Sequence, residues 1–362
     1  MQSGSTAIPA PEADLAGVVD LDALVSWMDD QALTGDAPSG FHWLGGGTQN
    51  VMVAFTRGGR RFVLRRGPRH LRATTNDNLR REMRVLAALA GTRVPHPHLI
   101  ACCSDESVLF GSVFYLMEPV DGFNAAATLP ALHASDAAVR HQMGLAIVDA
   151  LAELGAVDYR DVGLADFGRP DGFLERQVPR WLRELQSYNS LPGYGGPQLP
   201  GIARITDWLQ ANRPASWRPG IMHGDFHLAN IMFSFESSAV TAVVDWEMST
   251  IGDPLLDLGW LLATWPQPGE HTDIGDSALA NAGGLASVGE LVARYAERSN
   301  RDVSDVLWYT VLACFKLGVI LEGTHARACA GRAPVDVGDR LHQATIHLFE
   351  RALALTSGTQ NL

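Results

Sequence analysis

The chain has 362 residues, of which 46% are hydrophobic and 19% are charged, so it can form one large or two modest globular domains. The net charge of −12 argues against a nucleic-acid partner. We find no run of about 18 uncharged apolar residues and no basic flank near the start, so we predict a cytoplasmic protein without a membrane span or a secretory signal.

The charge is unevenly distributed along the chain. Residues 37–121 contain 11 Arg and 6 Asp or Glu, a net charge of +5, which leaves −17 for the remainder. A basic segment before an acidic one suits a nucleotide held against metal ligands, and it equally suits a solvated surface with no such role. The only lysine is Lys316, so a Walker-type phosphate loop, which needs Gly-Lys before Ser or Thr, is excluded.

The first part of the chain combines one helix with several strands. Residues 1–36 are predicted to form an extension with one helix, for which Asp20 is the N-cap. Residues 41–55 are predicted to be two strands joined by a Gly-rich turn, whose backbone N–H groups can approach phosphates closely. A plain hairpin turn has the same composition, so the turn alone does not identify a phosphate site.

Alternating hydrophobicity continues through the next segments. We expect strands at 61–65, 99–103 and 113–117, a helix at 78–90, and an exit into a loop at 118–122. Arg65 lies on the first of these strands, and alternation points Arg66 to its other face. Glu82 lies beside the apolar stripe of the helix, and periodicity alone would predict an exposed side chain.

The second part of the chain is mainly helical, with two short apolar strands inside it. Lys316 lies among apolar neighbours, and we expect its amine to reach the surface. Residues 190–201 are rich in Pro and Gly, so we predict a flexible excursion near an acceptor site. The predicted helices cover 136–154, 173–188, 202–209, a segment that reaches 264, 288–297, 306–322 and 335–355, and the strands cover 231–233 and 242–244.

Two polar motifs flank the predicted strand at 231–233. The first is His223-Gly224-Asp225, with Asn230 five residues after the Asp; the second is Asp245-Trp246-Glu247 at the end of an apolar strand. Phosphoryl transfer from a nucleotide uses these parts, because one carboxylate orients the acceptor hydroxyl while an amide oxygen and a second carboxylate hold Mg²⁺.

These motifs, in this order and spacing, resemble the aminoglycoside phosphotransferase-like kinases, and are similar to the branch that occurs alone or fused to acyl-CoA dehydrogenases. The resemblance covers roughly residues 40–355 and implies a two-lobed, protein kinase-like α+β fold. An antiparallel-sheet lobe at 37–121 would clamp the nucleotide, and a helical lobe at 122–362 would carry the catalytic and metal-binding loops.

The resemblance also implies roles for individual residues in a Mg²⁺-dependent transfer of the γ-phosphate of ATP or GTP to a small-molecule hydroxyl. Asp225 is the predicted catalytic base or orienter, and Asn230 and Asp245 are the predicted metal ligands. His223, Asp257 and Glu247 are predicted to support them. The predicted nucleotide contacts are Gly46, Gly47, Thr48, Asn50, Arg65, Glu82, Met117, Glu118 and Val120.

The sequence leaves the acceptor open: an aminoglycoside-like molecule, a hydroxy acid and a hydroxyacyl-CoA all remain candidates. It also leaves two rival functions. Arg65 stands where related kinases carry lysine, which would suit a nucleotide-binding pseudokinase. His223, Asp225 and His227 could instead serve a metal-dependent hydrolase, but this needs a further ligand cluster, and His325, His342 and His347 look scattered.

Overall fold

The structure is a computed structural model that describes residues 8–9, 15, 17–45, 50–266 and 277–359. Its internal contacts divide the chain into two compact units. Unit 1 comprises Met1–Phe123, Met232–Phe235 and Thr241–Ser249, and unit 2 comprises Asn124–Ile231, Glu236–Val240 and Thr250–Leu362. The sheet of unit 1 and the helices of unit 2 confirm the predicted α+β class.

Unit 1 is built on a six-stranded antiparallel sheet with the order β1-β2-β3-β4-β6-β5. Its strands are β1 (Ile8–Pro9), β2 (Ser39–Trp43), β3 (Val51–Arg57), β4 (Arg60–Arg66), β5 (Leu99–Cys103) and β6 (Phe114–Met117). The tight β3–β4 hairpin turns at Gly58 and Gly59, both with positive φ, as two-residue hairpin loops require.

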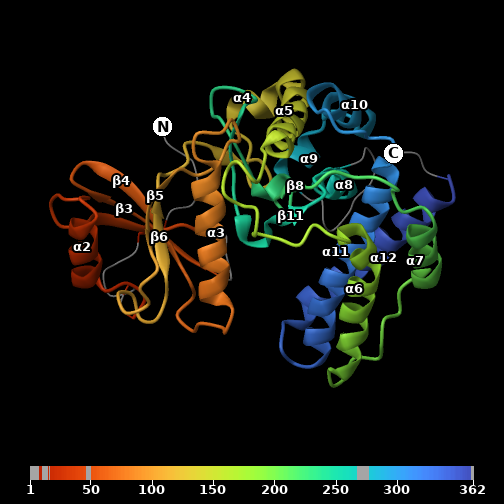
Figure 1. Cartoon of the computed structure of the whole chain (residues 1–362), viewed down its shortest axis with the longest axis horizontal. Coiled ribbons are helices and arrows are strands. Elements are labelled where there is room, and N and C mark those ends of the chain that lie inside the picture. Colours follow the sequence, from red (N-terminus) through yellow and green to blue (C-terminus); the bar gives the residue numbers. More distant parts are fainter. Residues whose placement is uncertain (1–7, 10–14, 16, 46–49, 267–276, 360–362) are drawn as a thin grey trace. The chain divides into compact units, whose positions relative to one another are not determined.

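Alternation along β4 divides its side chains between the two faces of the sheet. Phe62 and Leu64 belong to an apolar core that also takes Leu24 and Met28 from α2 (Leu21–Asp30). Arg65 points to the other face, where α3 (Thr75–Leu89) lies (Figure 1). The helix of the predicted N-terminal extension is therefore part of the same core as the sheet.

Arg57 links α2 to the end of β3. Its side chain is buried, and it donates hydrogen bonds to Asp29 Oδ1 at 2.7 Å, to the Val25 carbonyl at 3.3 Å and to the Asp36 carbonyl at 3.3 Å. A buried guanidinium needs several acceptors to replace lost water, and here both the helix and the segment after it supply them.

Unit 2 is mainly helical, and its centre is α11 (Val306–Cys329), which packs against α12 (Val335–Thr356) and α8 (Leu255–Thr264) (Figure 1). The remaining helices are α4 (Ala131–Ser135), α5 (Ala137–Ala156), α6 (Phe173–Ser187), α7 (Ile202–Ala211), α9 (Ala278–Ala282) and α10 (Val288–Arg298), with 3₁₀ turns η1 (Tyr188–Ser190) and η2 (Leu228–Asn230).

The helix α11 is longer than predicted, because helical geometry continues past Glu322 to Cys329. By length and composition α11 could cross a membrane, but 78% of its most apolar window is buried inside the fold, as in the core helix of a globular unit.

Short strands carry the chain from one unit to the other. A three-stranded sheet has the order β10-β9-β7, with β7 at Phe123–Asn124, β9 at Ile231–Phe233 and β10 at Val240–Val243. β10 leads to the 3₁₀ turn η3 (Trp246–Met248), and a separate pair within unit 2 joins β8 (Gly220–Met222) to β11 (Thr250–Gly252). The predicted catalytic and metal-binding residues lie at the ends of these strands.

We predict that Arg57→Met lowers the free energy of unfolding by about 2 kcal/mol, because it removes the charge-assisted hydrogen bonds by which a buried guanidinium joins β3 to α2 and to the segment after α2. Urea unfolding followed by circular dichroism measures this. Arg60→Met is the matched control, because Arg60 lies opposite Arg57 at the same end of the hairpin but makes an exposed ion pair with Glu118. Equal losses for the two variants would contradict the role given to Arg57.

Candidate active site

The predicted catalytic loop begins where β8 ends. β8 pairs antiparallel with β11, so that Met222 lies opposite Thr250. The helix α8 starts at Leu255, shortly after β11, and the pairing therefore brings its first turn beside the residues that follow Met222. Residues 223–225 and residue 257 are far apart in sequence, and this strand pair brings them together.

The carboxylate of Asp257 binds two consecutive backbone amides of the loop. Its Oδ2 atom accepts a hydrogen bond from the N–H of His223 at 2.6 Å, and its Oδ1 atom accepts one from the N–H of Gly224 at 2.9 Å. Gly224 has φ of +87°, a left-handed conformation that a glycine adopts without strain. The predicted supporting role of Asp257 requires contacts of this kind.

Lys316 binds Gly224 as well, at its carbonyl oxygen. Its ammonium donates a hydrogen bond to the Gly224 carbonyl at 3.1 Å and lies 4.3 Å from the ring centroid of Trp260. The expectation that Lys316 reaches the surface was therefore wrong: its side chain is buried, because the loop carbonyl and an indole face replace water around the charge. The signal in the sequence was that Lys316 is the only lysine of the chain.

Burial shifts the pKa values of Asp257 and Lys316 in opposite directions. It raises the pKa of Asp257 above its ordinary value, and the amides of His223 and Gly224 and the Lys316 ammonium oppose that shift. It lowers the pKa of Lys316 below its ordinary value, against the attraction of Asp257 and Asp225. Each charge thus depends on the other to stay ionised inside the protein.

Asp225 comes directly after Gly224, the residue that Asp257 and Lys316 hold. Its Oδ2 atom lies 3.3 Å from His227 Nε2, and Asn230 Nδ2 donates to the Asp225 carbonyl at 2.9 Å and to Oδ2 at 3.2 Å. Partial burial acts to raise the pKa of Asp225, but the hydrogen bond and charge of His227, with His223 and Lys316, outweigh it and hold this pKa below its ordinary value. Asp225 is therefore ionised at neutral pH and can accept a proton.

The two histidines of the loop have local roles in this geometry. His223 is fully buried, and its Nδ1 atom accepts a hydrogen bond from the Asp225 N–H at 3.3 Å. His227 precedes η2 and caps it, with Nδ1 accepting from the Ala229 N–H at 3.3 Å. Within the described residues, His223, Asp225 and His227 do not form a group of converging metal ligands, which counts against the hydrolase alternative.

In unit 1, Arg65 lies at the centre of a charged cluster. Its Nε atom donates to Glu82 Oε2 on α3 at 3.0 Å, and a terminal nitrogen donates to Asp245 Oδ1 at 3.0 Å. Burial raises the pKa of Glu82 to about 7, against the attraction of Arg65, while the surrounding carboxylates keep Arg65 cationic. Arg66 points to the opposite face, where it donates to the Leu109 carbonyl at 3.2 Å, so alternation correctly separates the two arginines.

Asp245 has φ of +67° and is one of three non-glycine residues with positive φ in the described part of the chain. Such a conformation costs free energy, and strained residues of this kind cluster at functional sites. The side chain of Asp245 is 41% exposed, so its second oxygen has access to solvent. Glu247 follows in the first turn of η3 and is close enough to influence the titration of Glu82.

The remaining predicted nucleotide contacts are only partly described. Gly46, Gly47 and Thr48 lie outside the described residues, and Asn50 is half-buried just before β3. Met117 ends β6 and is buried, and Val120 is half-buried in the loop that follows. The Glu118 N–H donates to the His98 carbonyl at 2.9 Å. These residues stay predicted contacts, as does the convergence of Asp225 and Asn230 with Asp245.

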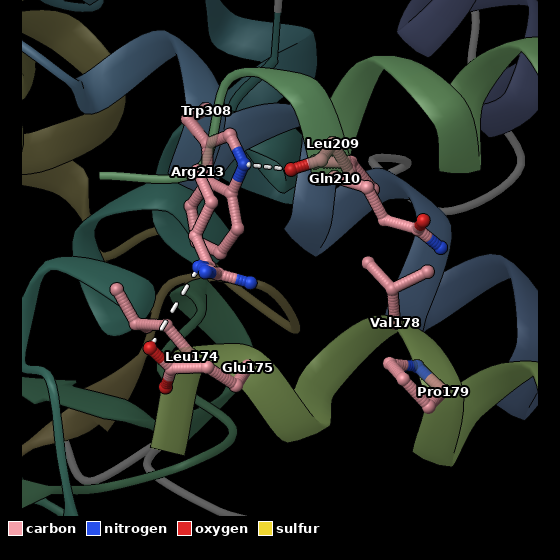
Figure 2. A pocket seen from close by; sticks show the side chains of 8 residues that line it. All are labelled: Leu174, Glu175, Val178, Pro179, Leu209, Gln210, Arg213 and Trp308. Carbon is pink, nitrogen blue, oxygen red and sulfur yellow. Dashed lines mark hydrogen bonds and ion pairs between the residues drawn. The ribbon is translucent and has the colours of Figure 1, made fainter. Parts of the chain in front are cut away.

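A hollow of about 350 Å³ lies elsewhere in unit 2, among α6, α7 and the start of α11 (Figure 2). Its wall includes Trp308, whose indole N–H donates to the Leu209 carbonyl at 2.8 Å, and an ion pair of Arg213 with Glu175 at 3.7 Å. None of the predicted site residues lines it. We therefore assign no part of the chemistry to this hollow.

We predict that Lys316→Met lowers the free energy of unfolding by about 3–5 kcal/mol, because it leaves the buried Asp257 carboxylate without its cation. In the double variant with Asp257→Asn, the losses should not add, because the two charges attract one another and bind the same residue, and groups in one such network have interaction energies of about 0.5–3 kcal/mol. Urea unfolding of both single variants, the double variant and the wild type measures this coupling. Strictly additive losses would contradict the pairing.

Comparison with known proteins agrees with this geometry. The profile described as "Phosphotransferase enzyme family" matches residues 42–291. The chain is 30% identical over 317 residues to "Acyl-CoA dehydrogenase family member 11" of Gallus gallus. The matched region is 86% of this chain and 39% of that relative. It is 28% identical over 298 residues to "Acyl-CoA dehydrogenase family member 10" of Mus musculus, and this match is 81% of the chain and 27% of that relative. The chain thus spans well under half the length of these relatives.

Solved structures show the same relationship. A structure from Ralstonia eutropha JMP134, described provisionally as an aminoglycoside phosphotransferase, has a TM-score of 0.76 and 29% identity, covering 92% of this chain and 98% of that one. An ethanolamine kinase of Plasmodium vivax, with a TM-score of 0.58 and 11% identity over 94% of each chain, shares the fold. The chain therefore belongs to the phosphotransferase enzyme family, with the kinase-like fold that its motifs predict, in the branch related to acyl-CoA dehydrogenase family members 10 and 11.

Proposed function

We propose that this phosphotransferase moves the γ-phosphoryl group of ATP or GTP to a hydroxyl group of a small hydroxy acid or of its acyl-CoA thioester. The observation that supports this most directly is the environment of Asp225. Its carboxylate is ionised and lies beside His227 and Asn230, and the residue before it, Gly224, is held by Asp257 and Lys316.

Asp225 has the properties that the acceptor step requires. The step forms a bond from the acceptor oxygen to the γ-phosphorus, breaks the bond from that phosphorus to the bridging oxygen, and releases the hydroxyl proton. An ionised carboxylate orients the hydroxyl by accepting its hydrogen bond and takes the proton as the new bond forms. Because the backbone just before Asp225 is fixed on both sides, little of this orientation is lost to loop motion.

The oxygen donors at the two motifs fit Mg²⁺. The contacts of Asn230 with Asp225 use its Nδ2 atom and leave the amide oxygen for a metal, and Asp245 is held by Arg65 through Oδ1 while its side chain stays 41% exposed. Hard oxygen ligands of this type suit Mg²⁺ beside phosphates. Asn230 and Asp245 would hold the ion, and Glu247 would orient water on it. When bound, Mg²⁺ offsets the negative charge of the phosphates.

Arg65 would contact the inner phosphates in place of the usual lysine. Its guanidinium binds Glu82 and Asp245 through separate nitrogens, and a planar guanidinium also matches the geometry of phosphate oxygens. The departure from lysine is thus compatible with nucleotide binding. The pseudokinase alternative predicts binding without turnover.

One observation favours an acyl-CoA-related acceptor over an aminoglycoside. The relatives that match this chain are named for acyl-CoA dehydrogenases.

We predict that Asp225→Asn lowers kcat by a factor of about 10² or more while nucleotide affinity changes little, because the proton acceptor is lost and its shape is kept. Steady-state turnover and titration with a nucleotide analogue measure the two effects. Asp207→Asn, an exposed change on α7, is the matched control. Full turnover by Asp225→Asn would contradict the role of Asp225.

We predict that Arg65→Met raises the KM for the nucleotide at least about tenfold, because the phosphate contact is lost. Arg65→Lys should recover part of this loss, since a lysine can contact a phosphate but cannot bind both carboxylates as the guanidinium does. Thermal unfolding of each variant must accompany the kinetics, because Glu82 is buried beside Arg65. An unchanged KM in a folded Arg65→Met variant would exclude the phosphate contact.

An acceptor panel tests the reaction itself. Purified protein is incubated with Mg²⁺-ATP or Mg²⁺-GTP and with a hydroxy acid, its CoA thioester or an aminoglycoside, and nucleoside diphosphate release is coupled to a spectrophotometric signal. We expect turnover with a hydroxy acid or thioester. Tight nucleotide binding without turnover for every acceptor would support the pseudokinase instead, and turnover with the aminoglycoside alone would overturn the proposed acceptor class.

A further inference from the structure

Four ionisable side chains gather where α11 lies against α12, apart from the catalytic loop. Glu322 and His325 are three residues apart on α11, and Asp339 and His342 are three residues apart on α12. Residues with this spacing share one face of a helix, so each helix presents a carboxylate and an imidazole together. The expectation that His325 and His342 are scattered was wrong: their rings are stacked, with centroids 4.4 Å apart.

The ligand atoms of this cluster are close enough to bind one ion. One such atom from each of Glu322, His325 and His342 lies within 4.8 Å of the others. Glu322 Oε2 is 2.7 Å from His342 Nδ1, and His325 Nδ1 is 3.6 Å from Asp339 Oδ1. A tetrahedral zinc ion with bonds of about 2.1 Å holds neighbouring ligand atoms roughly 3.4 Å apart, so small side-chain rotations suffice.

An unsatisfied nitrogen points to a missing partner. His325 Nδ1 is buried and has no hydrogen-bond partner, and its neighbour Asp339 Oδ1 is just beyond hydrogen-bonding distance. The other ring nitrogen, Nε2, contacts the Cys329 sulfur at 3.6 Å. Leaving a buried polar atom unpaired costs free energy, and an ion bound at Nδ1 would remove that cost.

The fold brings these side chains together through two close approaches. A Cβ atom on Gly338 would lie 2.4 Å from the Cβ of Ala328, so the missing side chain lets α12 lie directly on α11 beside His325. A Cβ atom on Gly193 would lie 2.7 Å from the Cys329 carbonyl, and the next residue, Tyr194, donates its hydroxyl to Glu322 Oε1 at 2.6 Å. Tyr194 thus orients the Glu322 carboxylate and leaves Oε2 facing the histidines, as a partner of a metal ligand does.

We propose that Glu322, His325 and His342 form a binding site for Zn²⁺, with the Asp339 carboxylate or a water molecule as the fourth ligand. Two imidazoles with carboxylates suit a borderline ion such as Zn²⁺ better than Mg²⁺ or Ca²⁺, which prefer oxygen ligands alone. The bound ion takes the place of the proton that His342 Nδ1 and Glu322 Oε2 share, and this proton passes to solvent. The ion would join α11, α12 and, through Tyr194, the segment before α7.

The test is Zn²⁺ titration of the full chain by calorimetry, after chelator treatment and with excess Mg²⁺ present. We expect one Zn²⁺ per chain and a rise in Tm on binding. His325→Ala and His342→Ala should each weaken the affinity at least about 100-fold, since loss of an outer partner alone costs 10–100-fold, and Tyr194→Phe should weaken it about tenfold. His347→Ala and Asp336→Asn, exposed changes on α12, are the matched controls and should bind as the wild type does.

The outcomes separate clearly. Binding that is lost in His325→Ala and His342→Ala but kept in both controls supports the site. No stoichiometric binding to the wild type, or equal binding to His325→Ala and the wild type, overturns it. Both histidines are partly exposed, with 18% of each side chain accessible, so folding of these variants is expected and is checked by Tm without metal. The readouts do not involve phosphoryl transfer, so they stand apart from the proposed function.

Discussion

One buried carboxylate, bound to two consecutive backbone amides, is the contact on which the candidate active site depends. Asp257 holds His223 and Gly224 by their N–H groups, and Lys316 holds the Gly224 carbonyl. Phe226 packs inside the protein, but packing does not set the direction of the backbone just before Asp225, which comes from hydrogen bonds to rigid elements. Here α8 and α11 provide the rigid elements, and Asp225 takes its position from them.

The same arrangement explains why a charged pair is found in the core of unit 2. A buried ion pair contributes little net stability compared with apolar residues of the same size, because both charges lose their hydration. The pair fixes the direction of the backbone: the carboxylate binds the N–H of Gly224 and the ammonium binds its carbonyl, which apolar packing does not do. The left-handed conformation at Gly224 turns the chain so that Asp225 follows immediately.

Unit 1 uses an arginine where related kinases use a lysine, and its surroundings have adapted to that choice. A lysine makes one point contact, whereas the Arg65 guanidinium bridges Glu82 and Asp245 with separate nitrogens.

In unit 2, the helix α11 contributes to two separate clusters. Its middle carries Lys316 beside the catalytic loop, and its end carries Glu322 and His325 against α12. The central helix of unit 2 therefore bears both clusters of buried charge that we describe there.

The fold class, most helices and strands, and the residues on which the chemistry is proposed to depend could all be predicted from the sequence. These follow from periodicity and from the spacing of the motifs around Asp225 and Asp245, which are local properties of the chain. Alternation along β4 also separated Arg65 from Arg66 correctly. The end of α11 was misplaced, because apolar periodicity fades beyond Glu322 while packing against α12 continues the helix.

Which side chains from distant parts of the sequence contact one another could be seen only in the three-dimensional structure. Lys316 was expected at the surface, yet its ammonium is buried against the loop after β8 and against indoles of α8 and α6. A buried ammonium is tolerated only when groups from other elements, such as a carbonyl, a carboxylate and an indole, replace water around it. The pairing of His325 with His342 likewise depends on the close approach that Gly338 permits. Spacing along a chain reports which residues share a face, whereas burial and partner choice depend on what the rest of the fold places opposite that face.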